Sequence, residues 1–322
     1  MLAIHPPRLA DRPLEGLPSR TALAEALWID LSEPTAEEVV AVQDALGVEM
    51  PTRSEMQEIE MSSRLYAERG ALFMTATVIH RATTEFPETA AITFVLTGKH
   101  LVTVRYADPT PFRTFAPKAD RNYITYATRD KMFGGLIDEI IDRVADILEL
   151  AGSELDGISR AIFDNRSKAE AAPNYTAMLE RIGRCGDLAA KARESLVTLS
   201  RVASFYIENQ RANSSLDLDE HWRTIRSDLA SLSEHASFLN SKTNFFLDAT
   251  LGMINIEQNS IIKIFSVAAV VFLPPTLVAS VYGMNFDFMP ETHWPLGYPF
   301  AIVLMIVSAV LPCLYFKRKG WL

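Results

Sequence analysis

The sequence predicts an α+β domain, built as an α/β/α sandwich, followed by a long stalk helix and two C-terminal transmembrane helices. Three observations predict this fold. The first 125 residues mix strand and helix patterns, and the region from residue 126 to 263 has helical periodicity. Two long uncharged apolar runs then lie near the C-terminus. A chain of 322 residues is long enough for both a soluble part and a membrane part.

The composition argues against several classes of function. The formal net charge of −9 makes general binding to nucleic acid improbable. Cys185 and Cys313 lie far apart, so neither a disulfide framework nor a thiolate zinc site is expected. The six histidines show no metal-ligand spacing, and no nucleophile–base pair or phosphate-binding loop stands out. We therefore expect neither an enzyme nor a bound cofactor.

Strand and helix signals define a cytoplasmic α/β domain over residues 1–125. Strands are expected at 26–31 and 71–79, and a hairpin at 91–96 and 100–104 around the turn at Gly98. A helix is expected from Thr35 to Leu46, because Thr35 and Glu38 have the spacing of a capping box. The N-terminus has no basic stretch followed by an apolar one, so we expect no cleavable signal peptide.

Two helices are expected to form an antiparallel hairpin over residues 126–212. Apolar residues recur at helical spacing from about Met132, and the pattern runs towards Phe163. A second helix is expected after Pro173 and extends to about Gln210, where residues 213–215 break it.

The stalk helix, residues 213–263, is predicted to continue from about Leu216 into the first membrane span as one helix on the order of 100 Å long. The alternative is two helices with a kink near Gly252. Apolar residues alternate three and four apart along the stalk, which is a heptad pattern. Such a face needs partners, so it argues for a homo-oligomer. Its members are Trp222, Ile225, Leu229, Leu232, Ala236, Leu239, Thr243, Phe246, Thr250 and Met253.

Residues 264–282 and 299–316 are the two predicted membrane spans, called here TM1 and TM2. TM1 has nineteen uncharged residues and would be roughly 28 Å long, close to the hydrocarbon thickness of a bilayer. The basic tail at 317–322 follows TM2, whereas the linker 283–298 has no Lys or Arg. The positive-inside rule therefore puts both ends of the chain in the cytoplasm and the linker outside, in the periplasm.

A second face of the same long helix is small or polar at many positions, and we call it the polar stripe. Hydroxyl and amide groups in lipid cost free energy unless they face water or a partner. The stripe is thus expected to line a water-filled path among copies of the helix, or alternatively to let helices pack closely. Its members are Ser280, Thr276, Leu273, Ala269, Ser266, Ile262, Asn259, Asn255, Gly252 and Asp248.

The stripe leads to Gly283-Met284-Asn285 at the outer end of TM1, which is typical of a pore mouth. Because Mg²⁺ dehydrates reluctantly and prefers oxygen ligands, a ring of amide and carbonyl oxygens could hold the hydrated ion by its waters. Asp287 and Glu291 would raise the local concentration of cations.

Five short stretches near the C-terminus together form a recognisable pattern: Tyr282 to Phe286, Met289-Pro290-Glu291, Trp294, Gly297-Tyr298-Pro299 and the end from Phe316 to Leu322. This pattern resembles the CorA family of magnesium transporters. The resemblance implies a funnel-shaped homopentamer in a bacterial inner membrane, with TM1 lining the pore and residues 283–285 selecting the ion. Candidate pore-lining residues are Ser280, Thr276, Leu273, Ala269, Ile262, Asn259 and Asp248.

The family closes its pore when intracellular Mg²⁺ binds carboxylates between neighbouring cytoplasmic domains. Thr224 stands where a regulatory aspartate would be expected. Asp219, Glu220 and Asp228 are the candidates that remain for this metal, and a solvated helix face is the other interpretation of the same residues.

The expected function is passage of hydrated Mg²⁺, with Co²⁺ and Ni²⁺ as further cargo, driven by the membrane potential. The partners are then further copies of the chain, membrane lipid and divalent cations. A zinc transporter of the ZntB type, with or without proton coupling, is the closest alternative, and His293 at the mouth favours it slightly. A membrane-anchored scaffold is the alternative from another class.

Overall fold

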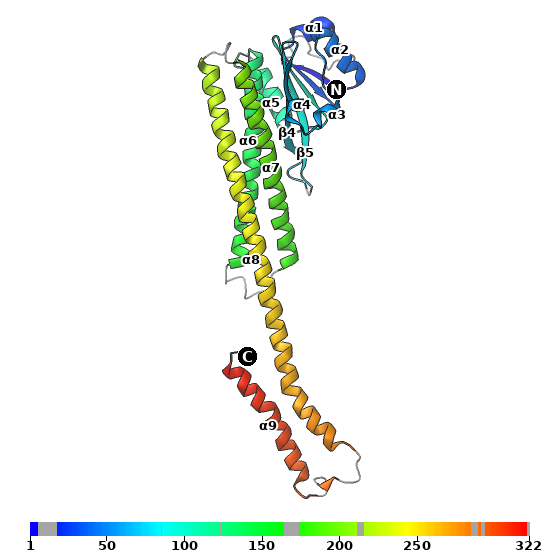
Figure 1. Cartoon of the computed structure of the whole chain (residues 1–322), viewed down its shortest axis with the longest axis vertical. Helices are drawn as coiled ribbons and strands as arrows, with labels where there is room; N and C mark the ends of the chain where they lie inside the picture. Colours follow the sequence, from blue (N-terminus) through cyan, green and yellow to red (C-terminus); the bar gives the residue numbers. More distant parts are fainter. Residues whose placement is uncertain are drawn as a thin grey trace. The chain divides into compact units, whose positions relative to one another are not determined.

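The structure is a computed structural model that describes residues 1–5, 18–84, 86–122, 124–163, 174–210, 216–284, 289–290 and 294–320 (Figure 1). The chain divides into two compact units, Met1–Leu247 and Asp248–Leu322. The first unit contains the sheet, its covering helices and the stalk as far as Leu247, and the second contains the two apolar helical segments.

A six-stranded mixed sheet organises the first unit, with the strand order β1-β2-β6-β5-β4-β3. Its strands are β1 (Leu2–His5), β2 (Trp28–Ser32), β3 (Leu65–Glu68), β4 (Ala71–His80), β5 (Glu88–Thr97) and β6 (His100–Arg105). The strands β2 and β6 are parallel, and the other pairs are antiparallel. The predicted hairpin is confirmed, because Thr97 pairs with His100 across its turn.

Helices cover both faces of this sheet, which confirms the predicted sandwich (Figure 1). The helix α2 contributes Val42 to a buried cluster with Ile29 and Leu31 of β2 on one face. On the other face, the ring of Trp28 lies 5.7 Å from that of Phe115 in α5. The helices are α1 (Arg20–Glu25), α2 (Ala36–Leu46), α3 (Arg53–Met56), α4 (Met61–Arg64) and α5 (Thr110–Arg121).

The capping box predicted at the start of α2 is present. The side chain of Thr35 accepts a hydrogen bond from the backbone N–H of Glu38, and the Glu38 carboxylate accepts one from the N–H of Thr35. The helix ends at Leu46, where Gly47 adopts a left-handed φ of 70°. The local sequence alone therefore determines both ends of this element.

The helical hairpin consists of α6 (Arg129–Phe163) and α7 (Tyr175–Gln210), which pack together along the sheet. Both helices begin and end within a few residues of the predicted positions. The expected break at 213–215 lies outside the described residues.

The stalk and TM1 form one continuous helix, α8 (Leu216–Tyr282), as the sequence predicts. Helical structure continues through Gly252, so the two-helix alternative is wrong. The last helix is α9 (Gly297–Arg318), which contains TM2. Two of the described helices, α8 and α9, are long and apolar enough to cross a membrane, and 6% of each apolar window is buried.

The heptad face of the stalk is buried within the same chain, which corrects the argument that it needs partner copies. Trp222, Leu229 and Leu239 are each at most 2% exposed. The ring of Trp222 lies 4.4 Å from that of Tyr206 in α7 and 5.3 Å from that of Phe133 in α6. From Trp222 to Phe246 the face therefore packs against the α6–α7 hairpin, and its periodicity is no evidence for self-association.

Polar contacts and one small residue fix the register of α8 on this hairpin. The Lys242 ammonium lies 2.6 Å from an Asp156 oxygen, and His221 Nε2 lies 2.7 Å from Asp138 Oδ2, both partners being in α6. A Cβ on Gly186 of α7 would lie 3.1 Å from Thr243 Cγ2, tighter than ordinary van der Waals contact. Glycine at this position thus allows α7 and α8 to approach closely.

Candidate functional site

The polar stripe of α8 is exposed over its whole length. All ten of its members, from Asp248 to Ser280, are exposed, and Leu273 and Ile262 are 65% and 61% exposed respectively. Burial in the second unit lies along another side of the helix, where Val267 is buried and Val271 and Val278 are half-buried. At about 100° per residue these positions are on the side roughly opposite the stripe.

Exposed apolar side chains flank the stripe on both sides. Val270 and Leu277 lie along one edge, and Phe265 and Phe272 lie along the other. This much apolar surface on one helix is far more than a soluble monomer exposes. The arrangement suits a helix that contacts neighbouring helices or lipid through its flanks and leaves the stripe between them.

Two consecutive prolines change the backbone in the middle of TM1. Pro274 and Pro275 have no N–H, so the carbonyls of Val270 and Val271 lose the bonds that a regular helix gives them. Within one turn, Thr276 Oγ1 donates a 2.7 Å hydrogen bond to the Phe272 carbonyl. The hydroxyl proton is thereby satisfied inside the helix, and the oxygen keeps lone pairs for water or an ion.

The first two residues of the predicted filter follow directly on α8. The Gly283 N–H donates to the Ala279 carbonyl at 2.9 Å, and the Met284 N–H donates to the Val281 carbonyl at 3.3 Å. A Cβ at Gly283 would lie 3.2 Å from the Ala279 oxygen, a contact with the preceding turn of its own helix. Asn285, Asp287, Glu291 and His293 lie outside the described residues.

The candidate regulatory acids lie along the first part of α8 and do not converge. Glu220 and Asp228 are exposed, and Asp219 is half-buried. Positions 220 and 228 are about 12 Å apart along the helix axis. Among the described residues, no group of three or more His, Cys, Asp or Glu side chains could hold a metal ion. A single chain therefore shows no assembled regulatory site at these residues.

An acidic surface on α6 beside the stalk was not singled out from the sequence. Burial and the neighbouring carboxylates of Asp138 and Glu139 raise the pKa of Asp142. The hydrogen bond to Asp138 raises the pKa of His221 at the start of α8. The signal was available, since these acids recur three and four apart on α6, but the partner on α8 is distant in sequence.

Comparisons with known proteins agree with this architecture. The family described as "CorA-like Mg2+ transporter protein" matches residues 24–318. The magnesium transport protein CorA of Yersinia pseudotuberculosis is 38% identical over 300 residues, which is 93% of each chain.

Solved structures share the fold at lower identity. The CorA magnesium transporter of Methanocaldococcus jannaschii is 17% identical with a TM-score of 0.73, over 92% of this chain and 91% of that one. The ZntB cytoplasmic domain of Vibrio parahaemolyticus is 10% identical with a TM-score of 0.53, over 71% of this chain and 87% of that one. At these identities the likeness concerns the fold alone.

Proposed function

This chain belongs to the family of CorA-like Mg²⁺ transporter proteins, and on that basis we propose that it conducts Mg²⁺ across a membrane through a pore lined by α8. The observation that carries the proposal is the exposed polar stripe. Its last five members lie in TM1, where the other residues are apolar apart from Tyr282, and the stripe leads to Gly283. Hydroxyl and amide groups of this kind cost free energy in lipid unless they bond their own helix, face water or face another copy of the chain, so a row of them favours a water-filled path.

The pore requires several copies of α8 around one axis, and we propose a funnel-shaped homopentamer. Each copy contributes the same residues, so every stripe position becomes a ring. From the cytoplasmic side outward, the proposed rings are Asp248, Asn259, Ile262, Ala269, Leu273, Thr276 and Ser280. The carboxylate ring attracts cations, and the apolar rings at Ile262 and Leu273 are the places where a pore could close by dewetting.

The proposed filter is the ring of Gly283, Met284 and Asn285. A hydrated Mg²⁺ ion presents water hydrogens outward, and neutral amide and carbonyl oxygens accept from them without stripping the waters. Asp287 and Glu291 in the periplasmic loop would concentrate cations at the entrance.

The membrane potential is sufficient to drive the flux. A divalent ion that crosses 100 mV gains about 4.6 kcal/mol, twice the value for one charge. Since about 1.4 kcal/mol is a factor of ten in an equilibrium constant, this sustains a gradient on the order of a thousandfold. Nucleotide hydrolysis is therefore not needed to accumulate Mg²⁺.

The test is ion flux into liposomes that contain the full-length protein. We expect Mg²⁺ uptake under an inside-negative potential, and we expect Asn285→Ala to abolish it while the oligomer still assembles. Asn209→Ala is the matched control, because Asn209 is an exposed residue of α7. Uptake of Zn²⁺ without Mg²⁺, especially with a proton gradient, would overturn the assignment of cargo. Unchanged Mg²⁺ uptake by Asn285→Ala would contradict the assignment of Asn285 to the filter.

A further inference from the structure

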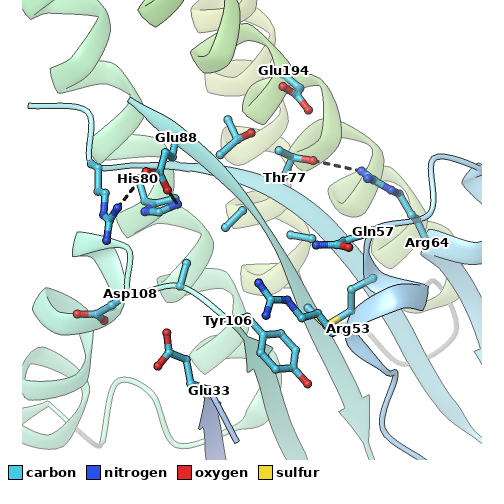
Figure 2. Close-up of a pocket in the computed structure, with 16 residues that line it drawn as sticks. Glu33, Arg53, Gln57, Arg64, Thr77, His80, Glu88, Tyr106, Asp108 and Glu194 are labelled. Carbon is cyan, nitrogen blue, oxygen red and sulfur yellow. Dashed lines mark hydrogen bonds and ion pairs between the residues drawn. The ribbon is translucent and has the colours of Figure 1, made fainter. Parts of the chain in front are cut away.

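A polar pocket of about 500 Å³ lies in the first unit, at the carboxyl ends of the parallel strands β2 and β6 (Figure 2). Glu33 follows β2, and Tyr106 and Asp108 follow β6. The helices that come after these strands, α2 and α5, cover opposite faces of the sheet. In open α/β sheets such a switch point creates a crevice in which ligands bind. A volume of 500 Å³ is typical of small-molecule sites.

Two guanidinium groups in this pocket are held in place without a carboxylate partner among the described residues. Arg53 lies over the ring of Tyr106, with its Cζ 5.1 Å from the ring centroid (Figure 2). Arg64 is half-buried; its Nε donates to the Glu58 carbonyl and its Nη1 to Thr77 Oγ1 at 3.2 Å, which leaves Nη2 free of a hydrogen bond among the described residues. A third arginine, Arg81, differs because its Nη1 lies 2.9 Å from Glu88 Oε1. Arg53 and Arg64 thus keep donors available for an anion.

Hydrogen-bond acceptors lie in the same pocket. Glu33 and Glu194 are exposed carboxylates, and neither forms an ion pair with another of the described residues. Figure 2 shows Glu194 and Glu33 on different sides of the group of labelled residues. Carboxylates of this kind accept hydrogen bonds from hydroxyl or amino groups. The ligand must therefore combine an anionic group with several donors.

The backbone around the pocket is unusual as well. Glu33 and Arg81 have φ values of 44° and 52°, in the left-handed region that non-glycine residues rarely adopt. Residues in such conformations persist where the surrounding structure holds them, and they concentrate at ligand sites. Both line this pocket, and neither is part of the proposed pore.

We propose that this pocket binds a phosphorylated small molecule of about nucleotide size, with its phosphate between Arg53 and Arg64 and its hydroxyl and amino groups towards Glu33 and Glu194. Guanidinium groups bind phosphate through paired N–H donors, which favours phosphate over a single carboxylate. Inorganic phosphate alone would leave most of the volume to water. The site is independent of the pore, so it stands whether or not the chain conducts Mg²⁺.

The test is calorimetric titration of the full-length protein in detergent with ADP, inorganic phosphate and adenosine as separate probes. We expect saturable binding of ADP, binding of inorganic phosphate at least about tenfold weaker, and no binding of adenosine. The double variant Arg53→Gln/Arg64→Gln should weaken ADP binding at least about tenfold, because it removes two charge-assisted contacts. Arg20→Gln, an exposed arginine of α1 outside the pocket, should leave it unchanged.

Thermal unfolding of the double variant checks that it is folded, and Tyr106→Ala supplies a second variant that removes the platform under Arg53 without changing charge. Absence of ADP binding, or equal ADP binding by the double variant and the wild type, would overturn the proposal. Equal affinity for ADP and inorganic phosphate would overturn the part that concerns the size of the ligand.

Discussion

Leu229→Ala tests whether the stalk is held by its own chain. Leu229 is 1% exposed and belongs to the α8 face that packs on the α6–α7 hairpin. Truncation of a buried leucine to alanine costs about 2–5 kcal/mol, through lost burial and the cavity left behind. At about 2–4 °C per kcal/mol for a unit of this size, a cost of 3 kcal/mol lowers Tm by roughly 6–12 °C.

The assay is thermal unfolding of the full-length protein in detergent, with the oligomeric state measured by light scattering at several protein concentrations. Leu216→Ala is the matched control, because Leu216 lies on the same helix and is 85% exposed. Its Tm should change by no more than about 2 °C. If Leu229→Ala instead dissociated the oligomer and left Tm unchanged, the face would be an interface between copies and our reasoning would be wrong.

Three further predictions follow from particular contacts. Asp30→Asn removes the bidentate carboxylate partner of Arg105, whose side chain is 8% exposed. The free energy of unfolding, measured in denaturant, should fall by about 3 kcal/mol, and a fall below about 0.5 kcal/mol would contradict this. The pKa of His221 is raised in the folded state, so its ion pair with Asp138 stabilises the protein fully below pH 6.5 and less as the pH rises through the folded-state pKa. The stabilisation that is lost is under about 1 kcal/mol, because the His221 side chain is 34% exposed. His221→Gln should therefore flatten the fall in Tm between pH 6 and 8, and an unaltered slope would refute the assignment. Thr276→Val should lower Mg²⁺ flux several-fold in liposomes, whereas Val278→Thr on the other side of α8 should not; equal effects would count against the stripe as the pore lining.

The elements of the fold that depend on local sequence were predictable. The α2 helix follows from its capping box, and the β5–β6 hairpin from its turn and alternating pattern. The strands β1 and β3 were not predicted, because each has four residues and pairs at an edge of the sheet. Such short segments carry too few residues for a period of two to stand out.

The heptad face of the stalk shows the limit of periodicity. Apolar residues that recur three and four apart indicate that one side of a helix is buried, but they do not indicate which element covers that side. Here the covering residues, among them Phe133 and Tyr206, come from two other helices of the same chain. Only the three-dimensional arrangement distinguishes this case from a coiled coil between copies.

The candidate site was predictable in a similar, partial way. The three- and four-residue spacing predicted which residues belong to the polar stripe, and all of these residues are exposed on α8. What the stripe faces depends on symmetry-related copies, which the sequence of one chain does not specify. The pocket at β2 and β6 escaped sequence analysis altogether, because Arg53, Arg64 and Tyr106 lie on separate segments that only the sheet topology brings together.

The most direct test of the pore is a structure of the assembled protein in a lipid nanodisc, resolved well enough to show side chains along its symmetry axis. We predict five copies of α8 around that axis, with Asn259, Thr276 and Asn285 pointing towards it. If these three side chains pointed to lipid, or if the particle had no rotational symmetry, α8 could not line the path of the ion.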